Sequence, residues 1–235
     1  MPSVLITGAN RGIGLELAKQ YIGQGWQVLT TCRDMRNATD LTALSEKNKL
    51  TVYQLDVTDH VAIDELAKEL AEKPIDVLIN NAGIIGPVPI PENIHRQNFG
   101  SIDYDLWQQV LQTNTFAPVK LAEALLPNIL MGDQKKIVTI SSTVGSVVER
   151  KTPAYAYATS KAAVNKAMTL LAEDLRAQGV AVGLICPGYV KTRMDFGDAD
   201  VEIPESAAGI RERIVELDMA LSGTFRRFNG ERIAW

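Results

Sequence analysis

The fold is constrained most by a regular alternation between short apolar runs and longer segments with helical periodicity. Residues 4–6 and 180–185 are continuously apolar, as expected for strands buried on both faces of a parallel sheet. Residues 61–71 instead carry an apolar stripe with charged residues opposite, the pattern of a helix that packs on one face. Strands that alternate with helices form a parallel sheet covered on both faces, so the chain predicts an α/β fold. The predicted strands are residues 4–6, 27–32, 52–55, 76–79, 136–140 and 180–185, with a last strand and turn in 222–230; the predicted helices are residues 15–22, 61–71, 105–131 (bent at Pro118) and 156–178.

The composition suits one domain with a sizeable core: the chain has 235 residues, of which 46% are hydrophobic and 22% charged. No linker, repeat or low-complexity tract divides it, so residues 1–235 are predicted to form a single domain. A net charge of −4 without a basic cluster argues against nucleic acid as a partner. No apolar run approaches the roughly 18 residues of a membrane span, and the N-terminus lacks the basic region of a signal peptide. We therefore expect a cytoplasmic protein with no membrane partner.

The cysteines and histidines do not indicate a metal site. Cys32 and Cys186 lie far apart in apolar runs, which is typical of two buried thiols in a reducing compartment. His60 and His95 have no cysteine or histidine at ligand spacing. We expect no metal.

A glycine-rich turn, residues 7–14, joins the first predicted strand to the first predicted helix. Glycines let the backbone approach a ligand closely, and a helix N-terminus offers free N–H groups and the positive end of the helix dipole. This arrangement is typical of a site for the phosphates of a dinucleotide. The alternative is a tight strand-to-helix turn that binds no ligand.

A tyrosine and a lysine, Tyr157 and Lys161, stand four positions apart in a predicted helix. Residues at this spacing lie on one helix face, so the phenol and the ammonium group are expected side by side. A cation close to a phenol favours the phenolate and lowers the pKa of the tyrosine, which tunes it for acid/base chemistry. The alternative is a chance pair on a solvated helix face.

Several motifs, in the right order at the ends of predicted elements, resemble the short-chain dehydrogenase/reductase family. They are the spacing Gly8-x-x-x-Gly12-x-Gly14, the tetrapeptide 80–83 (NNAG), the pair Tyr157 and Lys161, and the Pro187-Gly188 turn followed by Thr192. The resemblance covers nearly the whole chain and is strongest to the branch of carbonyl reductases and C-factor-like proteins. It implies a Rossmann-type doubly wound parallel sheet of seven strands, in a single NAD(P)-binding catalytic domain.

The resemblance also implies the catalytic residues. Ser142 would hydrogen-bond the substrate carbonyl, Tyr157 would be the acid/base, Lys161 would lower its pKa and bind the nicotinamide ribose, and Asn114 would hold a water of a proton relay. The usual gap from the serine would fall on Tyr155, which has Thr159 rather than a cation one helical turn later. An insertion of two residues around 149–153 accounts for the difference and makes Tyr155 a pocket or loop residue. The alternative for Asn114 is a packed polar residue.

The end of the second predicted strand bears on the choice between NAD and NADP. Cys32 stands where NAD-dependent members carry an acid, and Arg33 follows it, with Arg11 in the glycine turn. Two guanidinium groups favour NADP(H) over NAD(H), because they can bind a 2′-phosphate through charge-assisted hydrogen bonds. Asp34 is a complication, because it could neutralise Arg33.

The remaining cofactor contacts are also implied by the resemblance. Asp56 would bind the adenine, although it could equally be a turn or N-cap aspartate, and Thr192 would bind the nicotinamide carboxamide. The expected cofactor-binding residues are Gly8, Asn10, Arg11, Gly12, Ile13, Gly14, Arg33, Asp56, Val57, Asn80, Ala82, Gly83, Tyr157, Lys161, Pro187, Gly188, Val190 and Thr192.

Together these residues predict an NADPH-dependent oxidoreductase that transfers a hydride between the nicotinamide and a small-molecule carbonyl or secondary alcohol. One alternative is a C-factor-like signalling protein or NADP-binding sensor with little turnover. A sugar-nucleotide epimerase fits poorly, because the glycine spacing differs and too little chain follows residue 185 for a substrate domain. We expect the pocket walls in residues 84–103, 143–155 and 189–210. Ala162, Ala163 and Ala167 form a small-residue face that suggests a homodimer, although it could also pack internally.

Overall fold

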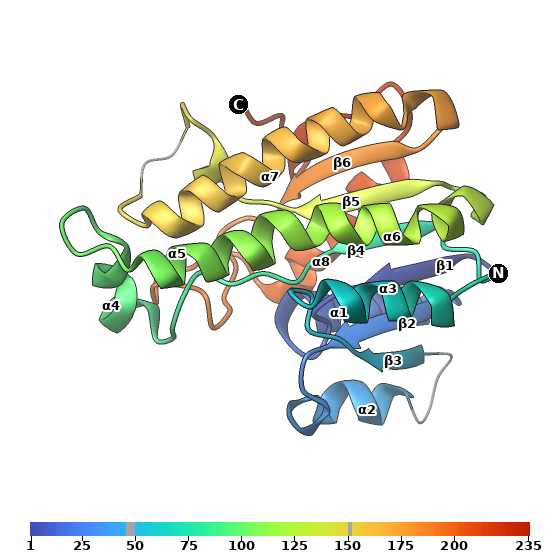
Figure 1. The fold of residues 1–235 in the computed structure, drawn as a ribbon, viewed down its shortest axis with the longest axis horizontal. Helices are drawn as coiled ribbons and strands as arrows, with labels where there is room; N and C mark the ends of the chain where they lie inside the picture. Colours follow the sequence, from blue (N-terminus) through green and yellow to red (C-terminus); the bar gives the residue numbers. More distant parts are fainter. Residues whose placement is uncertain (46–49, 150–151) are drawn as a thin grey trace.

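The computed structural model describes residues 1–45, 50–149 and 152–235. Its centre is a seven-stranded sheet in the order β3-β2-β1-β4-β5-β6-β7, with every neighbouring pair parallel (Figure 1). The strands are β1 (Ser3–Ile6), β2 (Gln27–Cys32), β3 (Leu50–Gln54), β4 (Val77–Asn80), β5 (Lys136–Ile140), β6 (Ala181–Cys186) and β7 (Phe225–Arg227). The predicted Rossmann-type doubly wound sheet is therefore confirmed. The strand order reverses between β1 and β4, and such a switch point is where this class of sheet binds ligands.

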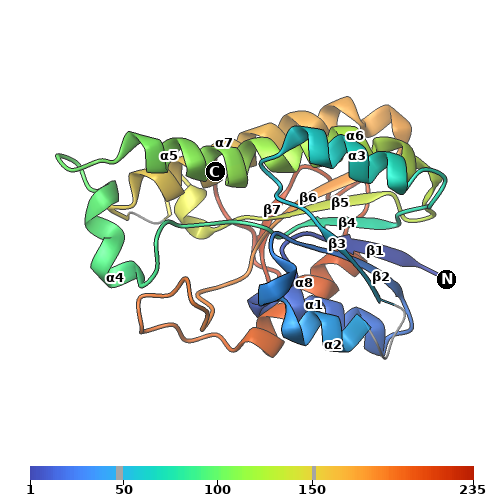
Figure 2. The same cartoon turned by 60° about the horizontal axis from the view of Figure 1, so that its bottom comes forward.

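Helices cover the sheet in two layers, which Figure 2 shows from the side. One layer holds α1 (Gly12–Gly23), α2 (Thr39–Ser45) and α8 (Ile203–Glu216). The other holds α3 (His60–Glu69), α5 (Tyr104–Leu111), α6 (Ala117–Met131) and α7 (Tyr155–Asp174), while α4 (Ile90–Asn93) lies beyond the sheet. In the described ranges no helix is both long and apolar enough to cross a membrane.

Successive residues of a strand point to opposite layers, and this explains why the central strand β1 has apolar residues in succession. In β1, Leu5 packs into the core on the side of α3, α6 and α7. Its neighbours Val4 and Ile6 pack into the core on the side of α1, α2 and α8. All three side chains are fully buried, as the sequence pattern of a two-sided parallel strand predicts.

A buried carboxylate links separate chain segments at the edge of the sheet where the parallel strands begin. Asp76 accepts hydrogen bonds from the backbone and hydroxyl of Ser3 and from the backbone N–H groups of Asp133 and Gln134. It therefore joins the start of β1 to the turn between α6 and β5, and satisfies two buried and two partly buried donors.

Several helices differ from the sequence prediction, among them α4, which it did not include, and α8, of which it expected only the start. The short helix α2 was not predicted, because residues 39–45 are too few to show a helical period. The single helix predicted for 105–131 is interrupted by a π-helical turn, Gln112–Phe116, between α5 and α6. Pro118, just beyond this turn, has no N–H to donate to the carbonyl of Asn114, so regular α-helical pairing cannot continue there.

Candidate active site

A cavity of about 1940 Å³ is lined by residues that directly follow β1, β2, β4, β5 and β6. It is larger than the roughly 300–1,000 Å³ of a pocket for one small ligand, so a dinucleotide and a substrate can share it. Of the predicted site residues, the structure brings these together at its wall: Gly8, Asn10, Arg11, Gly12, Ile13, Gly14, Arg33, Asp56, Val57, Ala82, Gly83, Ser142, Tyr157, Lys161, Pro187, Gly188, Val190 and Thr192. Asn80 and Asn114 are not among the lining residues.

The glycine turn is held against the segment after β4. A Cβ atom on Gly8, whose φ is +65°, would lie 2.9 Å from the Cα of Ala82, and one on Gly14 would lie 2.5 Å from the amide nitrogen of Asn81. Only glycine allows both approaches. The N-cap of α1, Arg11, makes no side-chain capping bond, so the first N–H groups of the helix face the cavity without a cap. This is the donor set that binds a phosphate at a helix N-terminus.

Three arginines line the cavity with guanidinium groups that form no ion pair or hydrogen bond within the described residues: Arg11, Arg33 and Arg193. Asp34, which the sequence left as a possible partner of Arg33, instead pairs with Arg36 at 2.9 Å. Burial lowers the pKa of Arg11, and the charges of Arg193 and Arg33 lower it further. Several unpaired cations at one cavity wall attract an anion that carries several charges. A phosphorylated dinucleotide is such an anion.

Asp56 and Asn80 occupy different environments. Asp56 lines the cavity and its carboxylate accepts from the backbone and hydroxyl of Thr58, so it is a turn residue as well as a wall residue. The N-cap of α3 is Asp59 rather than Asp56. Asn80 is buried and its amide donates to Pro118 and Thr139, so the structure places it inside the fold and corrects its expected position in the groove.

The neighbouring amide, Asn81, lines the cavity in place of Asn80 and donates to the backbone carbonyls of Thr7 and Gly8. Sequence reasoning missed it because the two asparagines are adjacent, and only the direction of the strand end decides which of them faces the groove.

Tyr157, Lys161 and Ser142 meet at the wall of the same cavity. The ammonium nitrogen of Lys161 lies 5.7 Å from the centre of the Tyr157 ring, so one helix face holds the pair as predicted. Lys161 is only 6% exposed, and its ammonium donates to the carbonyl of Ile140 at 2.8 Å. A Cβ atom on Gly83 would lie 3.8 Å from the Lys161 nitrogen, which places the cation beside the β4 loop.

The surroundings shift the pKa values of both groups. Burial raises the pKa of Tyr157 to about 12, the nearby Cys186 thiol acts in the same direction, and a hydrogen bond with Ser142 lowers it. Burial lowers the pKa of Lys161 to about 8, against a raising effect of Cys186. The sequence led us to expect a lowered pKa for Tyr157. The shift has the opposite direction because the loss of water around the phenol outweighs the hydrogen bond with Ser142.

Asn114 lies in the π-helical turn and is buried. Its side-chain oxygen accepts from the backbone N–H of Ile84, and its nitrogen donates to the carbonyl of Ile84 and to the hydroxyl of Ser160. Its side chain therefore fixes the loop after β4, which is the packed polar role that the sequence left open. π-Helical turns are frequent at functional sites.

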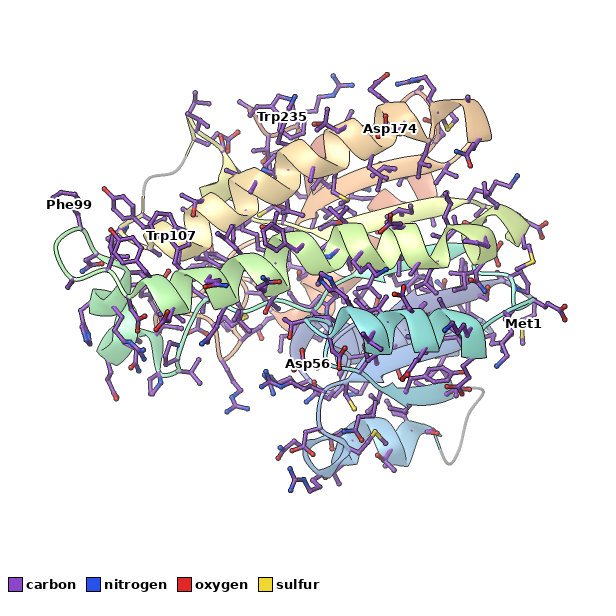
Figure 3. The ribbon with its side chains drawn as sticks, viewed as in Figure 1. Met1, Asp56, Phe99, Trp107, Asp174 and Trp235 are labelled. Carbon is purple, nitrogen blue, oxygen red and sulfur yellow. The ribbon has the colours of Figure 1, made fainter. Side chains whose placement is uncertain are left out.

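Tyr155 does not reach the cavity. It is the first residue of α7 and 40% exposed, and its ring lies 6.5 Å from that of Phe99 and 6.4 Å from that of Trp107. Figure 3 shows Phe99 and Trp107 at one end of the molecule, far from Asp56. Tyr155 was expected to be a pocket or loop residue, and the structure places it instead at the start of α7, outside the cavity. Residues 150 and 151, part of the expected insertion, lie outside the described residues.

The three predicted wall segments each contribute to the cavity. Residues 84–88 contribute from the first, Thr143, Val144, Thr152 and Pro153 from the second, and most of 189–203 from the third. Other segments that line it, 34–40, Thr113 and 227–231, were not predicted as wall. Residues 89–103, the remainder of the first segment, do not line the cavity.

The short chain dehydrogenase family matches residues 2–200. Together with the parallel sheet and the lining of the cavity, this match shows that the chain belongs to the short chain dehydrogenase family of oxidoreductases.

Individual relatives lie in the expected branch. The chain is 32% identical to 1-hydroxy-2-glutathionyl-2-methyl-3-butene dehydrogenase of Rhodococcus sp. (strain AD45), over the whole of both chains. It is also 32% identical to C-signal of Myxococcus xanthus, over 72% of this chain and 98% of that protein. The structure is similar to carbonyl reductase Sniffer of D. melanogaster, with a TM-score of 0.90, 32% identity and full coverage of both chains. It is equally similar to an NADPH-bound carbonyl reductase from chicken fatty liver, with a TM-score of 0.89, 32% identity and coverage of 100% and 99%.

Proposed function

We propose that the protein is an NADP(H)-dependent oxidoreductase that interconverts a small-molecule carbonyl compound and its alcohol. One observation carries the proposal: a buried Lys161 beside Tyr157 shares a single cavity with an uncapped helix N-terminus and three unpaired arginines. The first pair suits proton transfer to a developing alkoxide, and the second set suits a dinucleotide phosphate. The nicotinamide, when bound, supplies or accepts the hydride.

The residues of the chain have separate tasks in this reaction. Ser142 holds the carbonyl oxygen by a hydrogen bond, which stabilises the charge that develops there. Tyr157 gives its phenolic proton to that oxygen, and a pKa above neutrality keeps the proton in place until it is needed. The ammonium of Lys161 stabilises the phenolate left behind and is placed to bind the nicotinamide ribose.

Asn114 remains our candidate for holding the water that returns the proton. Its side chain is already hydrogen-bonded to Ile84 and Ser160. The main-chain carbonyl of Asn114, to which Pro118 cannot donate, is the group we assign to that water.

NADP(H) is preferred over NAD(H) because, among the described residues, Arg11, Arg33 and Arg193 form no ion pair with a carboxylate. Arg36 neutralises Asp34, so Arg33 keeps its charge for a 2′-phosphate. Arg11 and Arg193 lie close enough to act on the same anion. The NADPH in the carbonyl reductase from chicken fatty liver is consistent with this preference.

The substrate that suits the remaining cavity is a neutral, largely apolar carbonyl compound. Its wall includes Ile85, Val88, Val144, Met194 and Phe196, and these side chains offer no charge to an ionic substrate. We expect a cytoplasmic homodimer, although Ala167 of the small-residue face packs against the core of its own chain.

The likeness to C-signal favours a second candidate, a protein that binds NADP(H) and signals without much turnover. Binding of NADPH with no reduction across aldehydes, ketones and quinones would support that candidate. Turnover of any of them with NADPH would support the enzyme.

The test of the proposal is Tyr157→Phe, compared with Tyr155→Phe as a matched control. Tyr157→Phe should lower carbonyl reduction by at least about a hundredfold, because the proton donor is lost, and leave the Kd for NADPH unchanged. Tyr155→Phe should leave both values unchanged, because its ring lies outside the cavity. Retained turnover by Tyr157→Phe would refute the assignment.

A further inference from the structure

Gln97 is a buried amide between the pocket wall and the tyrosine helix. It ends a short 3-10 helix, Ile94–Gln97, and is only 3% exposed. Its side-chain nitrogen donates to the carbonyl of Ile85, and its side-chain oxygen accepts from the backbone N–H of Tyr157 at 3.1 Å. Both polar ends of one side chain are thus used, one on a residue of the cavity wall and one on Tyr157.

The N–H of Tyr157 needs such a partner. Tyr157 is the third residue of α7, where backbone N–H groups have no acceptor within the helix. The N-cap residue Ala154 has no side chain that could supply one, and no side-chain capping bond is formed there. Gln97 therefore caps the helix from a segment 60 residues earlier in the chain.

A second chain of hydrogen bonds reaches the other backbone group of Tyr157. The hydroxyl of Ser160 donates to the Tyr157 carbonyl at 2.7 Å and accepts from the amide of Asn114 at 3.0 Å. The same amide donates to the carbonyl of Ile84 at 2.8 Å. The N–H and the C=O of Tyr157 are thus connected, through two buried amides, to consecutive residues of the cavity wall.

We propose that Gln97 is a positioning residue, which holds Tyr157 at a fixed place relative to the pocket wall at Ile84 and Ile85. The inference rests on the proposed function, since it gives Gln97 a role in placing the proton donor. A bound carbonyl compound touches the wall on one side and the phenol on the other, and small errors in such placement are costly in rate. The assignment makes the segment before α5 part of the active site, although most of it lies outside the cavity.

The test compares Gln97→Met with Asn128→Leu, using menadione and 4-nitrobenzaldehyde as carbonyl probes. Asn128 is a matched control: it is an equally buried amide, 3% exposed, whose nitrogen donates to the carbonyls of Leu70 and Lys73, away from the cavity. Gln97→Met should lower kcat about tenfold or more and leave the Kd for NADPH within about twofold. Asn128→Leu should lower the thermal midpoint and leave kcat unchanged.

Ser160→Ala is a second variant with little loss of side-chain volume, and it removes the link between the carbonyl of Tyr157 and Asn114. It should also lower kcat and leave the Kd for NADPH unchanged. Wild-type kcat in a folded Gln97→Met protein would overturn the inference, as would parallel loss of kcat in Asn128→Leu. If Gln97→Met does not fold, Gln97→Glu takes its place, because it keeps the acceptor for the N–H of Tyr157 and loses the donor to Ile85; wild-type kcat in that variant would overturn the inference.

A wild-type protein that reduces neither probe would count against the proposed function instead. Hydrogen–deuterium exchange then decides the inference without turnover. Peptides covering 84–88 and 155–160 should exchange faster in Gln97→Met than in the wild type and be unchanged in Asn128→Leu. Equal exchange rates in Gln97→Met and the wild type would overturn the positioning role that we assign to Gln97.

Discussion

Lys161→Met should make the protein more stable at neutral pH. The lysine is buried, and burial lowers its pKa from 10.5 to about 8, so holding the charged form inside the fold costs about 3 kcal/mol. Methionine keeps most of the apolar stem and removes the charge. It also removes the hydrogen bond to Ile140, which returns about 1 kcal/mol of the gain. We expect a net rise of about 2 kcal/mol in the free energy of unfolding at pH 7.

The gain should depend on pH in a defined direction. Between pH about 8 and 10.5 the unfolded lysine holds a proton that the folded lysine has lost, so the wild type gains stability as the pH rises. The variant has no such group at this position. The difference between the two proteins should therefore be constant below about pH 8 and shrink from there to pH 10.5.

The assay is urea unfolding followed by tryptophan fluorescence at pH 7, 9 and 10, without cofactor. Lys166→Met is the matched control, because Lys166 lies on the same helix with an exposed side chain. It should change the stability by less than about 0.5 kcal/mol at each pH. A destabilised Lys161→Met at pH 7, or a difference that grows with pH, would refute the reasoning.

Three further outcomes follow from the site and the fold. Arg33→Ala and Arg193→Ala should each raise the Kd for NADPH about tenfold, because a charge-assisted contact is lost. Arg33→Ala should leave the Kd for NADH unchanged. An equal rise in the Kd for both cofactors in Arg33→Ala would contradict a contact with the 2′-phosphate. Asp76→Ala should lower the free energy of unfolding by about 3 kcal/mol or more in urea titrations, because it removes the acceptor of two buried and two partly buried donor groups. A change below about 1 kcal/mol would contradict this role. In steady-state assays, kcat/KM for carbonyl reduction should fall as the pH rises through about 8, where Lys161 loses its proton, and a flat profile from pH 6 to 10 would contradict an essential cation.

The sequence predicted the sheet because most strands are short, largely apolar and followed by a recognisable turn or helix. β2 and β5 have the predicted bounds, and most of the other strands differ by one or two residues. The residues of the cavity wall were largely predictable for the same reason, since the carboxyl ends of parallel strands meet at one edge. The choice of Tyr157 over Tyr155 followed from a cation one helical turn away, and the structure places only Tyr157 at the cavity.

Other features were not predicted, because they depend on local backbone conformation, on burial or on contacts between distant segments. The pairing of Asp34 with Arg36 rather than Arg33 is set by the short helix after β2. The raised pKa of Tyr157 comes from burial, which spacing along a helix does not show. Gln97 lies in a stretch without periodicity, and only the fold brings it to Tyr157.

The central claim is that the cavity supports hydride transfer between NADPH and a carbonyl carbon, with Tyr157 as the proton donor. NADPH deuterated on the transferring face of nicotinamide C4, incubated with the protein and 4-nitrobenzaldehyde, tests it directly. The account predicts that the wild type forms the alcohol with one deuterium on its carbinol carbon. Tyr157→Phe should form almost none of this alcohol. An alcohol without deuterium from either labelled face, or no alcohol from any carbonyl probe with tightly bound NADPH, would contradict it.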